Sequence, residues 1–168
     1  MKKVITIVAI LVFTKMSYAQ NIQGTSDTAA IKQTISTFFD AMREGDSTVL
    51  RSVFINGAVL ESIANDENGK TILSSKTADD LMKKIGTPHE AAYDERIVYG
   101  TIKIDGDLAC VWTPYQFFLG DQFSHCGVNV LQLMKTPDSW KIISIVYTIR
   151  NDNCFQQVYI LLKRLRIK

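Results

Sequence analysis

The stretch LACVWTPYQFFLGDQFSHCGVNVLQLMK, residues 108–135, decides the fold. β-Branched and aromatic residues dominate it, and Gly120-Asp121 interrupts it as a two-residue turn signal. We therefore predict two long antiparallel strands, Leu108–Leu119 and Gln122–Lys135, joined by a tight turn. Such a ribbon needs further strands or helices to bury its apolar side chains, and the flanking sequence supplies both.

Strand patterns continue on both sides of this pair. Asp94–Ile104 precedes it, with a tight turn expected at Asp105-Gly106, and Trp140–Arg150 follows it after the turn around Pro137. Together the four segments predict a meander of long antiparallel strands. Two shorter strands are expected earlier in the chain, Ala58–Ile63 and a partner that ends at Leu73.

Helical patterns lie upstream of the meander. Apolar residues recur every three to four positions from Ile31 to Met42, which predicts an amphipathic helix that ends near Gly45. A short helix from Asp46 to Phe54 and a third helix, Ala78–Ile85, follow. Helices followed by antiparallel strands predict an α+β fold with the helices packed on one face of the sheet.

The first 19 residues have the layout of a signal peptide. Met1-Lys2-Lys3 is a short positive segment, Val4–Phe13 is almost continuously apolar, and Ser17-Tyr18-Ala19 places small residues before a cut at Gln20. The apolar run is too short to span a bilayer as a mature helix. We therefore expect an exported protein, periplasmic or extracellular, whose mature chain begins at Gln20 and has no transmembrane segment.

Charge divides the chain into three parts. The predicted signal peptide, residues 1–19, carries three lysines, and the tail, residues 155–168, carries four basic residues and no acid. The domain between them, residues 20–154, has 12 basic and 17 acidic residues. A domain that binds nucleic acid normally carries a basic stripe, so the acidic balance of this one argues against a nucleic-acid partner.

The cysteines and glycines indicate no cofactor. Cys110, Cys126 and Cys154 are odd in number, which in an exported chain leaves at least one thiol unpaired or shared between chains. Their spacing fits no zinc pattern, and the glycines form no phosphate-binding loop. We expect neither a metal nor a cofactor.

Two stretches carry a family resemblance. One is Val111-Trp112-Thr113-Pro114-Tyr115, and the other runs from Ser124-His125-Cys126-Gly127-Val128-Asn129 to the closing Ser139-Trp140-Lys141-Ile142-Ile143-Ser144-Ile145. With the order of helices and strands, they resemble the nuclear-transport-factor-2-like superfamily, of cystatin-like fold, and more closely its exported lumazine-binding branch. The resemblance covers residues 28–154 and implies a cone-shaped, strongly bent sheet wrapped round three N-terminal helices, with a pocket inside.

The resemblance leaves the activity open, because this superfamily includes isomerases, dehydratases, cyclases and non-catalytic binders. Its ketosteroid-isomerase type needs an aspartate base together with a tyrosine and a protonated acid. That trio does not map onto this sequence residue by residue, which weighs against the isomerase reading.

The strand register predicts a ligand site. If Gly120-Asp121 is a two-residue turn, Gln116 faces His125 and Trp112 faces Asn129, and a tight turn at Asp105-Gly106 places Tyr99 opposite Trp112. One face of the sheet then combines aromatic side chains with a few convergent polar groups, as a small-molecule pocket requires. The predicted ligand-binding residues are Tyr99, Trp112, Gln116 and Asn129.

The opposite face is also apolar in this register, with Tyr115, Phe117 and Ile145 among its residues. Helices can cover only one face of the sheet, and an exposed apolar face usually marks a partner surface. We therefore expect a homodimer that packs sheet against sheet, and Ile145 is placed in that interface.

Three functions follow from these observations. The first is non-catalytic binding of a small apolar or aromatic molecule. The second is an enzyme of the isomerase, dehydratase or hydrolase type with His125 as the catalytic acid or base, for which Glu95 and Asp121 are the nearby acids. The third is an interaction module that works through the apolar sheet face. A structural, hydrogen-bonded histidine is the alternative for His125.

Overall fold

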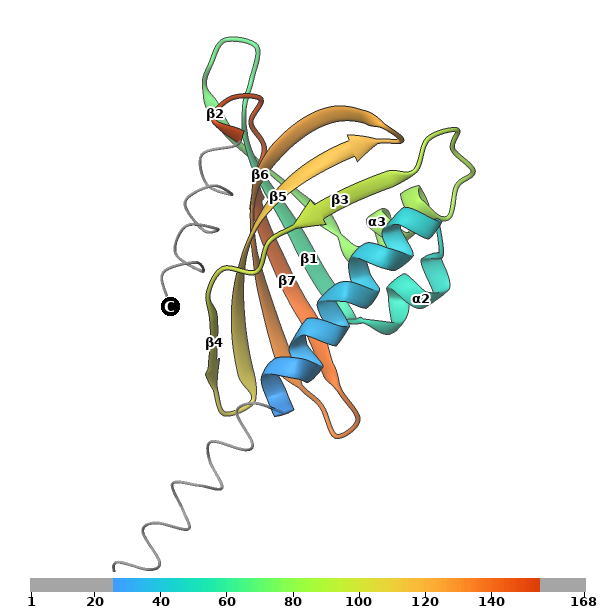
Figure 1. Ribbon diagram of the computed structural model, residues 1–168, viewed down its shortest axis with the longest axis vertical. Helices are drawn as coiled ribbons and strands as arrows, with labels where there is room; N and C mark the ends of the chain where they lie inside the picture. The colour runs from blue at the N-terminus through green and yellow to red at the C-terminus, as the bar shows by residue number, and fades with distance from the viewer. Residues whose placement is uncertain (1–25, 155–168) are drawn as a thin grey trace, which may run out of the picture.

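A strongly curved, unclosed sheet of seven strands dominates the computed structural model, which describes residues 26–154 (Figure 1). The predicted signal peptide and basic tail lie outside the described residues. The strand order is β2-β1-β7-β6-β5-β3, and β4 pairs with β5 beside β3. The strands are β1 (Phe54–Asn65), β2 (Thr71–Thr77), β3 (Tyr93–Ile97), β4 (Ile102–Asp105), β5 (Leu108–Leu119), β6 (Gln122–Lys135) and β7 (Trp140–Thr148).

Three helices pack on the concave face of the sheet, which confirms the predicted α+β class. They are the N-terminal helix (residues 26–44), α2 (Ser47–Ser52) and α3 (Ala78–Ile85). Asp46 caps α2 by accepting hydrogen bonds from the backbone N–H groups of Thr48 and Val49. Thr77 and Asp80 form a capping box at the start of α3. The short helix thus ends earlier than expected, and β1 begins at Phe54.

The predicted strand Asp94–Ile104 is two strands, β3 and β4, that both pair with β5. Between them Gly100 donates a backbone hydrogen bond to the Trp112 carbonyl oxygen, at 2.9 Å. A Cβ atom at Gly100 would lie 2.8 Å from that oxygen, so the close approach requires glycine. The expected single strand is therefore wrong at this point.

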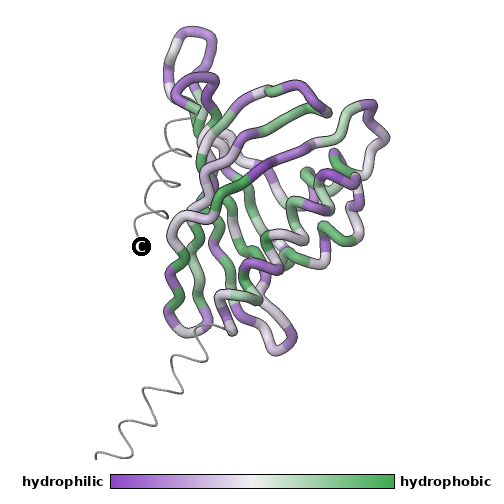
Figure 2. Tube along the Cα trace, viewed as in Figure 1, coloured by the Kyte–Doolittle hydropathy of each residue, from purple (hydrophilic) through white to green (hydrophobic). Residues whose placement is uncertain are grey.

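The core lies between the N-terminal helix and the concave face of the sheet. Ile31 and Ile35 of the helix are fully buried against this face. The sheet contributes four fully buried residues: Val111, Leu131, Leu133 and Ile142. Burying such side chains contributes about 1.5–3 kcal/mol each to stability. Figure 2 shows the resulting pattern, in which hydrophobic and hydrophilic residues alternate along helices and strands while the β1–β2 loop is hydrophilic.

Polar contacts fix the start of the N-terminal helix to the β6–β7 turn. The Asp27 carboxylate accepts hydrogen bonds from Lys135 Nζ at 2.7 Å and from Trp140 Nε1 at 3.3 Å. Thr34 Oγ1 donates to the Trp140 carbonyl oxygen at 3.0 Å. These bonds set where the helix crosses the sheet, and hence which part of the concave face it covers. No helix among residues 26–154 is long and apolar enough to cross a membrane.

Candidate functional site

A cavity of about 250 Å³ lies at the end of the concave face farthest from the β6–β7 turn. It is enclosed by the sheet on one side and by α3 and the end of the N-terminal helix on the other. Its volume is near the lower end of the range for ligand pockets, about 300–1,000 Å³. The lining side chains are mainly apolar or aromatic, with a few polar ones: Phe38, Met42, Leu60, Lys76, Leu81, Lys84, Ile85, Tyr93, Glu95, Tyr115, Phe117, His125, Asn129, Ile145, Tyr147 and Ile149.

A β-bulge decides which residues reach this cavity. The Gly120-Asp121 turn is tight as predicted, and Leu119 pairs with Gln122. Phe118 then pairs with Phe123 and Phe117 with His125, so that Ser124 is the extra residue of β6. The one-residue shift places His125 opposite Phe117, and Asn129 opposite Thr113. The expected pairs of Gln116 with His125 and of Trp112 with Asn129 are therefore wrong.

Because side chains alternate along a strand, the shift changes the composition of both faces. His125 and Asn129 line the cavity as predicted, whereas Tyr99, Trp112 and Gln116 do not. Trp112 lies on the convex face and is 46% exposed, and Gln116 pairs with Cys126 on the same face. The pair of Tyr99 with Trp112 is also absent: Tyr99 packs against the core, and its hydroxyl donates to the Lys32 carbonyl oxygen at 3.1 Å.

The aromatic side chains of the cavity come from the face that had been predicted as a dimer surface. Tyr115, Phe117, Ile145 and Tyr147 all line the cavity, and Ile145 is only 3% exposed. The prediction that Ile145 lies on an exposed sheet face is wrong because of a second shift, in β7: Ile142 pairs with Leu133 and Ser144 with Gln132, which leaves Ile143 as the extra residue. The convex face instead carries Trp112 and Val59, both partly exposed.

Glu95 is one of the two acids that the sequence places near His125. It lies on β3 opposite Phe117, and one carboxylate oxygen accepts a hydrogen bond from Asn129 Nδ2 at 2.7 Å. Burial in the cavity raises the pKa of Glu95 from 4.5 to about 7, against the opposing effect of the Asn129 bond. A carboxyl with this pKa exchanges its proton near neutral pH. The other nearby acid, Asp121, lies in the exposed β5–β6 turn.

His125 is held between aromatic rings. Its ring stacks on Phe117 with centroids 4.8 Å apart and meets Tyr115 edge to face at 5.8 Å. The Ser124 hydroxyl lies 3.0 Å from Nδ1, which fixes the ring orientation. Burial, with a smaller effect from the positive charge of Lys84, lowers the pKa of His125 below 6.5. The imidazole is therefore neutral at pH 7 and can accept a proton from, or share one with, a bound molecule.

Gly127 shapes the wall between these groups. Gly127 lies between His125 and Asn129 on the cavity side of β6. Because it has no side chain, the Tyr115 ring can cross β6 there. The Tyr115 hydroxyl then donates a hydrogen bond to the Thr148 carbonyl oxygen at 2.8 Å. A Cβ atom at Gly127 would lie 1.8 Å from that oxygen and 2.6 Å from the Tyr115 ring. Only glycine fits there. Burial and the nearby Glu95 both raise the pKa of the Tyr115 hydroxyl, which keeps it protonated.

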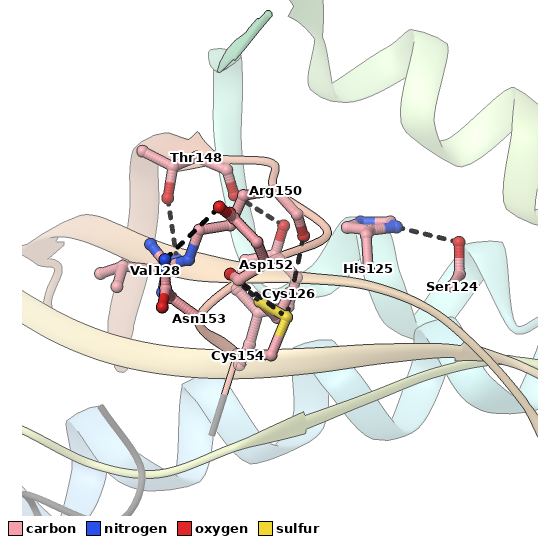
Figure 3. The surroundings of a disulfide bond; sticks show 10 residues. Ser124, His125, Cys126, Val128, Thr148, Arg150, Asp152, Asn153 and Cys154 are labelled. Atoms are coloured by element: carbon pink, nitrogen blue, oxygen red, sulfur yellow. Dashed lines mark hydrogen bonds between the residues drawn. A yellow bond between two sulfur atoms is a disulfide. The ribbon is translucent and has the colours of Figure 1, made fainter. Parts of the chain in front are cut away.

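A disulfide joins Cys126 to Cys154 behind the cavity wall (Figure 3). Backbone hydrogen bonds of 2.9 Å run both ways between Cys126 and Arg150, so the chain after β7 is tied to β6. Figure 3 shows that the His125 ring points away from this cluster. One cysteine of the three is therefore unpaired, as the odd number requires, and it is Cys110.

No metal-binding group is evident in the part of the chain that the structure describes, where no three His, Cys, Asp or Glu side chains cluster. The cavity combines a titrating carboxyl, an amide and a neutral imidazole with apolar walls. Such a site can orient a small organic molecule by hydrogen bonds and stacking, and its two titratable groups can exchange protons with it.

Residues 26–148 match the family described as "Putative lumazine-binding". The chain belongs to this family. The match spans the three helices and all seven strands, so the family resemblance inferred from the sequence is confirmed. None of the curated proteins matches the sequence.

Solved structures of nuclear-transport-factor-2-like proteins share the fold. A protein of unknown function from Shewanella baltica is 18% identical, with a TM-score of 0.58 over 76% of this chain and 97% of its own. A protein with a cystatin-like fold from Novosphingobium aromaticivorans is 14% identical, with a TM-score of 0.62 over 81% and 90%. A "putative dehydratase" from Streptomyces avermitilis is 16% identical, with a TM-score of 0.57 over 76% and 98%. At these identities the likeness concerns the fold alone.

Proposed function

We propose that this domain binds a small, largely apolar or aromatic molecule in the cavity of its concave face. The hydrogen bond between Asn129 and Glu95 carries the proposal. A carboxyl and an amide placed in an otherwise apolar cavity cost free energy to bury, and that cost is offset when a ligand uses their remaining hydrogen-bonding capacity. Tyr93, Phe117 and the His125 ring stack on one another and form an aromatic wall against which such a ligand can pack.

A thermal-shift screen of residues 20–168 against flavins, pterins, steroids, fatty acids and aromatic acids tests this proposal. A ligand at a hundredfold excess over its dissociation constant adds about 2.7 kcal/mol of stability, which is easily detected. Binding should weaken in Asn129→Leu, inside the cavity, and persist in Trp112→Ala, on the convex face. A hit that is lost in Trp112→Ala and kept in Asn129→Leu would contradict the proposed site.

Acid–base catalysis is the second candidate, and the paired titratable groups favour it. Glu95 with a pKa of about 7 and a neutral His125 share one cavity, so one can donate a proton while the other accepts one. An isomerase or dehydratase needs such a pair. If the domain is an enzyme, His125→Ala removes turnover of a bound compound and leaves its affinity within a few fold. If binding is the whole function, the hits of the screen remain chemically unchanged after prolonged incubation.

We also propose that the domain is a homodimer formed through the convex face of its sheet. Trp112 and Val59 are large apolar side chains there that are 46% and 38% exposed, and exposed apolar surface commonly marks a partner site. Analytical ultracentrifugation measures the mass directly. We expect a dimer for the wild type and a monomer for Trp112→Asp, and a stable wild-type monomer would contradict the proposal.

Export is proposed from the signal-peptide pattern of residues 1–19, which lie outside the described residues. The Cys126–Cys154 disulfide supports it, because disulfides persist mainly in oxidising compartments outside the cytoplasm. N-terminal sequencing of the protein recovered from the periplasm or medium tests the cut. The expected first residue is Gln20, and an intact Met1 in the cytoplasmic fraction would contradict it.

A further inference from the structure

Charge is unevenly distributed around the cavity. Lys76 and Lys84 carry a full charge at neutral pH, Glu95 can gain one, and His125 is neutral. Both lysines are exposed, whereas Glu95 is half-buried and its carboxylate accepts a hydrogen bond from Asn129. The exposed rim of the cavity therefore carries two positive charges, and the less exposed part carries a carboxyl that is neutral or negative.

Neither lysine forms an ion pair with another described residue, in contrast to Lys135, which pairs with Asp27 at 2.7 Å. Asp80 interacts with the charge of Lys76, but its carboxylate already accepts hydrogen bonds from the Thr77 backbone and hydroxyl at 3.0 and 2.7 Å.

Lys84 is directed toward the aromatic wall. Its Nζ lies 4.9 Å from the centre of the Tyr93 ring, and Tyr93 stacks on Phe117 with centroids 6.0 Å apart. Lys84 itself lines the cavity, and its positive charge contributes to the lowered pKa of His125. A cation held on an aromatic face at a pocket entrance is well placed to meet a negative group of a bound molecule.

We infer that the ligand of this cavity is a planar aromatic or conjugated acid, whose anionic group lies at the exposed rim beside Lys84 and whose ring system packs against the aromatic wall that includes Phe117 and His125. The inference rests on the proposed binding function and adds a ligand class and an orientation to it. The reverse orientation would remove the anionic group from Lys84 and place it beside Glu95, which would then have to remain protonated. The inner end of the ligand is therefore uncharged and hydrogen-bonds with Glu95 and Asn129.

Calorimetric titration with matched probes tests this inference. 2-Naphthoate and 2-naphthamide have the same ring system and differ mainly in charge, and 2-naphthyl phosphate separates a carboxylate preference from a general anion preference. We expect the wild type at low salt to bind 2-naphthoate about five- to tenfold more tightly than 2-naphthamide. In Lys84→Met this preference should fall below about twofold, while the affinity for 2-naphthamide stays the same.

Lys83→Met is the control, because Lys83 is the preceding residue of α3, is exposed and does not line the cavity. It should keep the wild-type preference. Equal binding of both naphthalene probes, or an equal loss of the preference in Lys83→Met and Lys84→Met, would overturn the inference and leave the binding function intact. If the folded wild type binds none of the three probes, the result would count against both the inference and the binding function.

Discussion

The concave face of the sheet has two ends, built from the same strands, that differ in what covers them. At the end near the β6–β7 turn, Val111, Leu131, Leu133 and Ile142 are completely buried beneath the N-terminal helix. At the other end the same strands β5 to β7 present half-buried Phe117, His125 and Tyr147 to a cavity of about 250 Å³. We call these the closed end and the cavity end.

The two ends differ in burial because the helices cover them differently, not because the strands differ. The first turns of the N-terminal helix lie on the sheet and are held there by the Asp27 contacts with Lys135 and Trp140. At the cavity end, the cover consists of Met42 and of α3 residues such as Leu81 and Ile85, with space between them and the sheet. Truncation of core side chains should therefore cost most stability at the closed end, and ligand binding should depend on the cavity end. Four predictions test this separation, beginning with the largest effect.

Leu133→Ala removes a fully buried side chain from the closed end and should lower the free energy of unfolding by about 3–5 kcal/mol. Affinity for a cavity ligand should change less than threefold while the protein is folded. Leu108→Ala is the control, because Leu108 is 50% exposed on β5 and should cost less than about 1 kcal/mol. Urea denaturation measures both, and equal losses would contradict the assignment of the closed end.

Removal of the disulfide by Cys126→Ser with Cys154→Ser should cost about 3–4 kcal/mol, because the two cysteines are 28 residues apart and the bond restricts the unfolded chain. The chain after β7 should also loosen, and Ile149 of this segment lines the cavity. Ligand affinity should therefore fall as well. Cys110→Ser leaves the disulfide intact and should change neither property; a loss of stability as large as that of the double variant would refute this explanation.

Stability should depend on pH through Glu95. Its pKa is raised from 4.5 to about 7, so the folded protein keeps a proton that the unfolded chain loses between these values. The free energy of unfolding therefore falls as the pH rises from 4.5 to 7. The expected fall due to Glu95 is on the order of 2 kcal/mol, reduced from the full effect of the shift because Glu95 is only half-buried.

Glu95→Gln is neutral at every pH and should remove this component. The difference between wild type and variant, measured by urea denaturation at pH 5 and pH 8, isolates Glu95 from His125, whose lowered pKa acts in the opposite direction. Parallel pH profiles for the two proteins would show that Glu95 titrates normally and does not occupy a desolvated site.

Trp112→Ala should have the smallest effect on the domain itself. Trp112 is 46% exposed on the convex face, so we expect a loss of less than about 1 kcal/mol and a ligand dissociation constant within twofold of the wild type. Urea denaturation measures the stability and calorimetry measures the dissociation constant, both at a protein concentration where the oligomeric state is known. A tenfold loss of affinity would place the ligand outside the cavity.

The sequence predicted the elements of this fold better than its site. The apolar period from Ile31 to Met42, the capping residues Asp46 and Thr77, and the Gly120-Asp121 turn are local signals, and each determines local structure directly. The family resemblance supplied the bent sheet. The parallel pairing of β1 with β7 was not predicted, because no local pattern indicates it.

Of the predicted site residues, only His125 and Asn129 line the cavity, because one extra residue shifts the pairing of β6 with β5. Ser124 forms the bulge, and nothing in its immediate neighbours distinguishes it from a regular strand residue. His125 and Asn129 were assigned to the pocket, but their expected partners Trp112 and Gln116 lie on the opposite face. Glu95 comes from β3, across β5 from His125, so its bond to Asn129 depends on a register that the sequence does not define.

The most direct test of the account is a ¹⁵N–¹H NMR titration of the mature protein with 2-naphthamide or 2-naphthoate. We predict that the amide signals of Phe117, His125 and Asn129 shift with saturation, while those of Leu133 and Trp112 remain in place. Shifts confined to the closed end or to the convex face would contradict the claim that the cavity end of the concave face is the binding site.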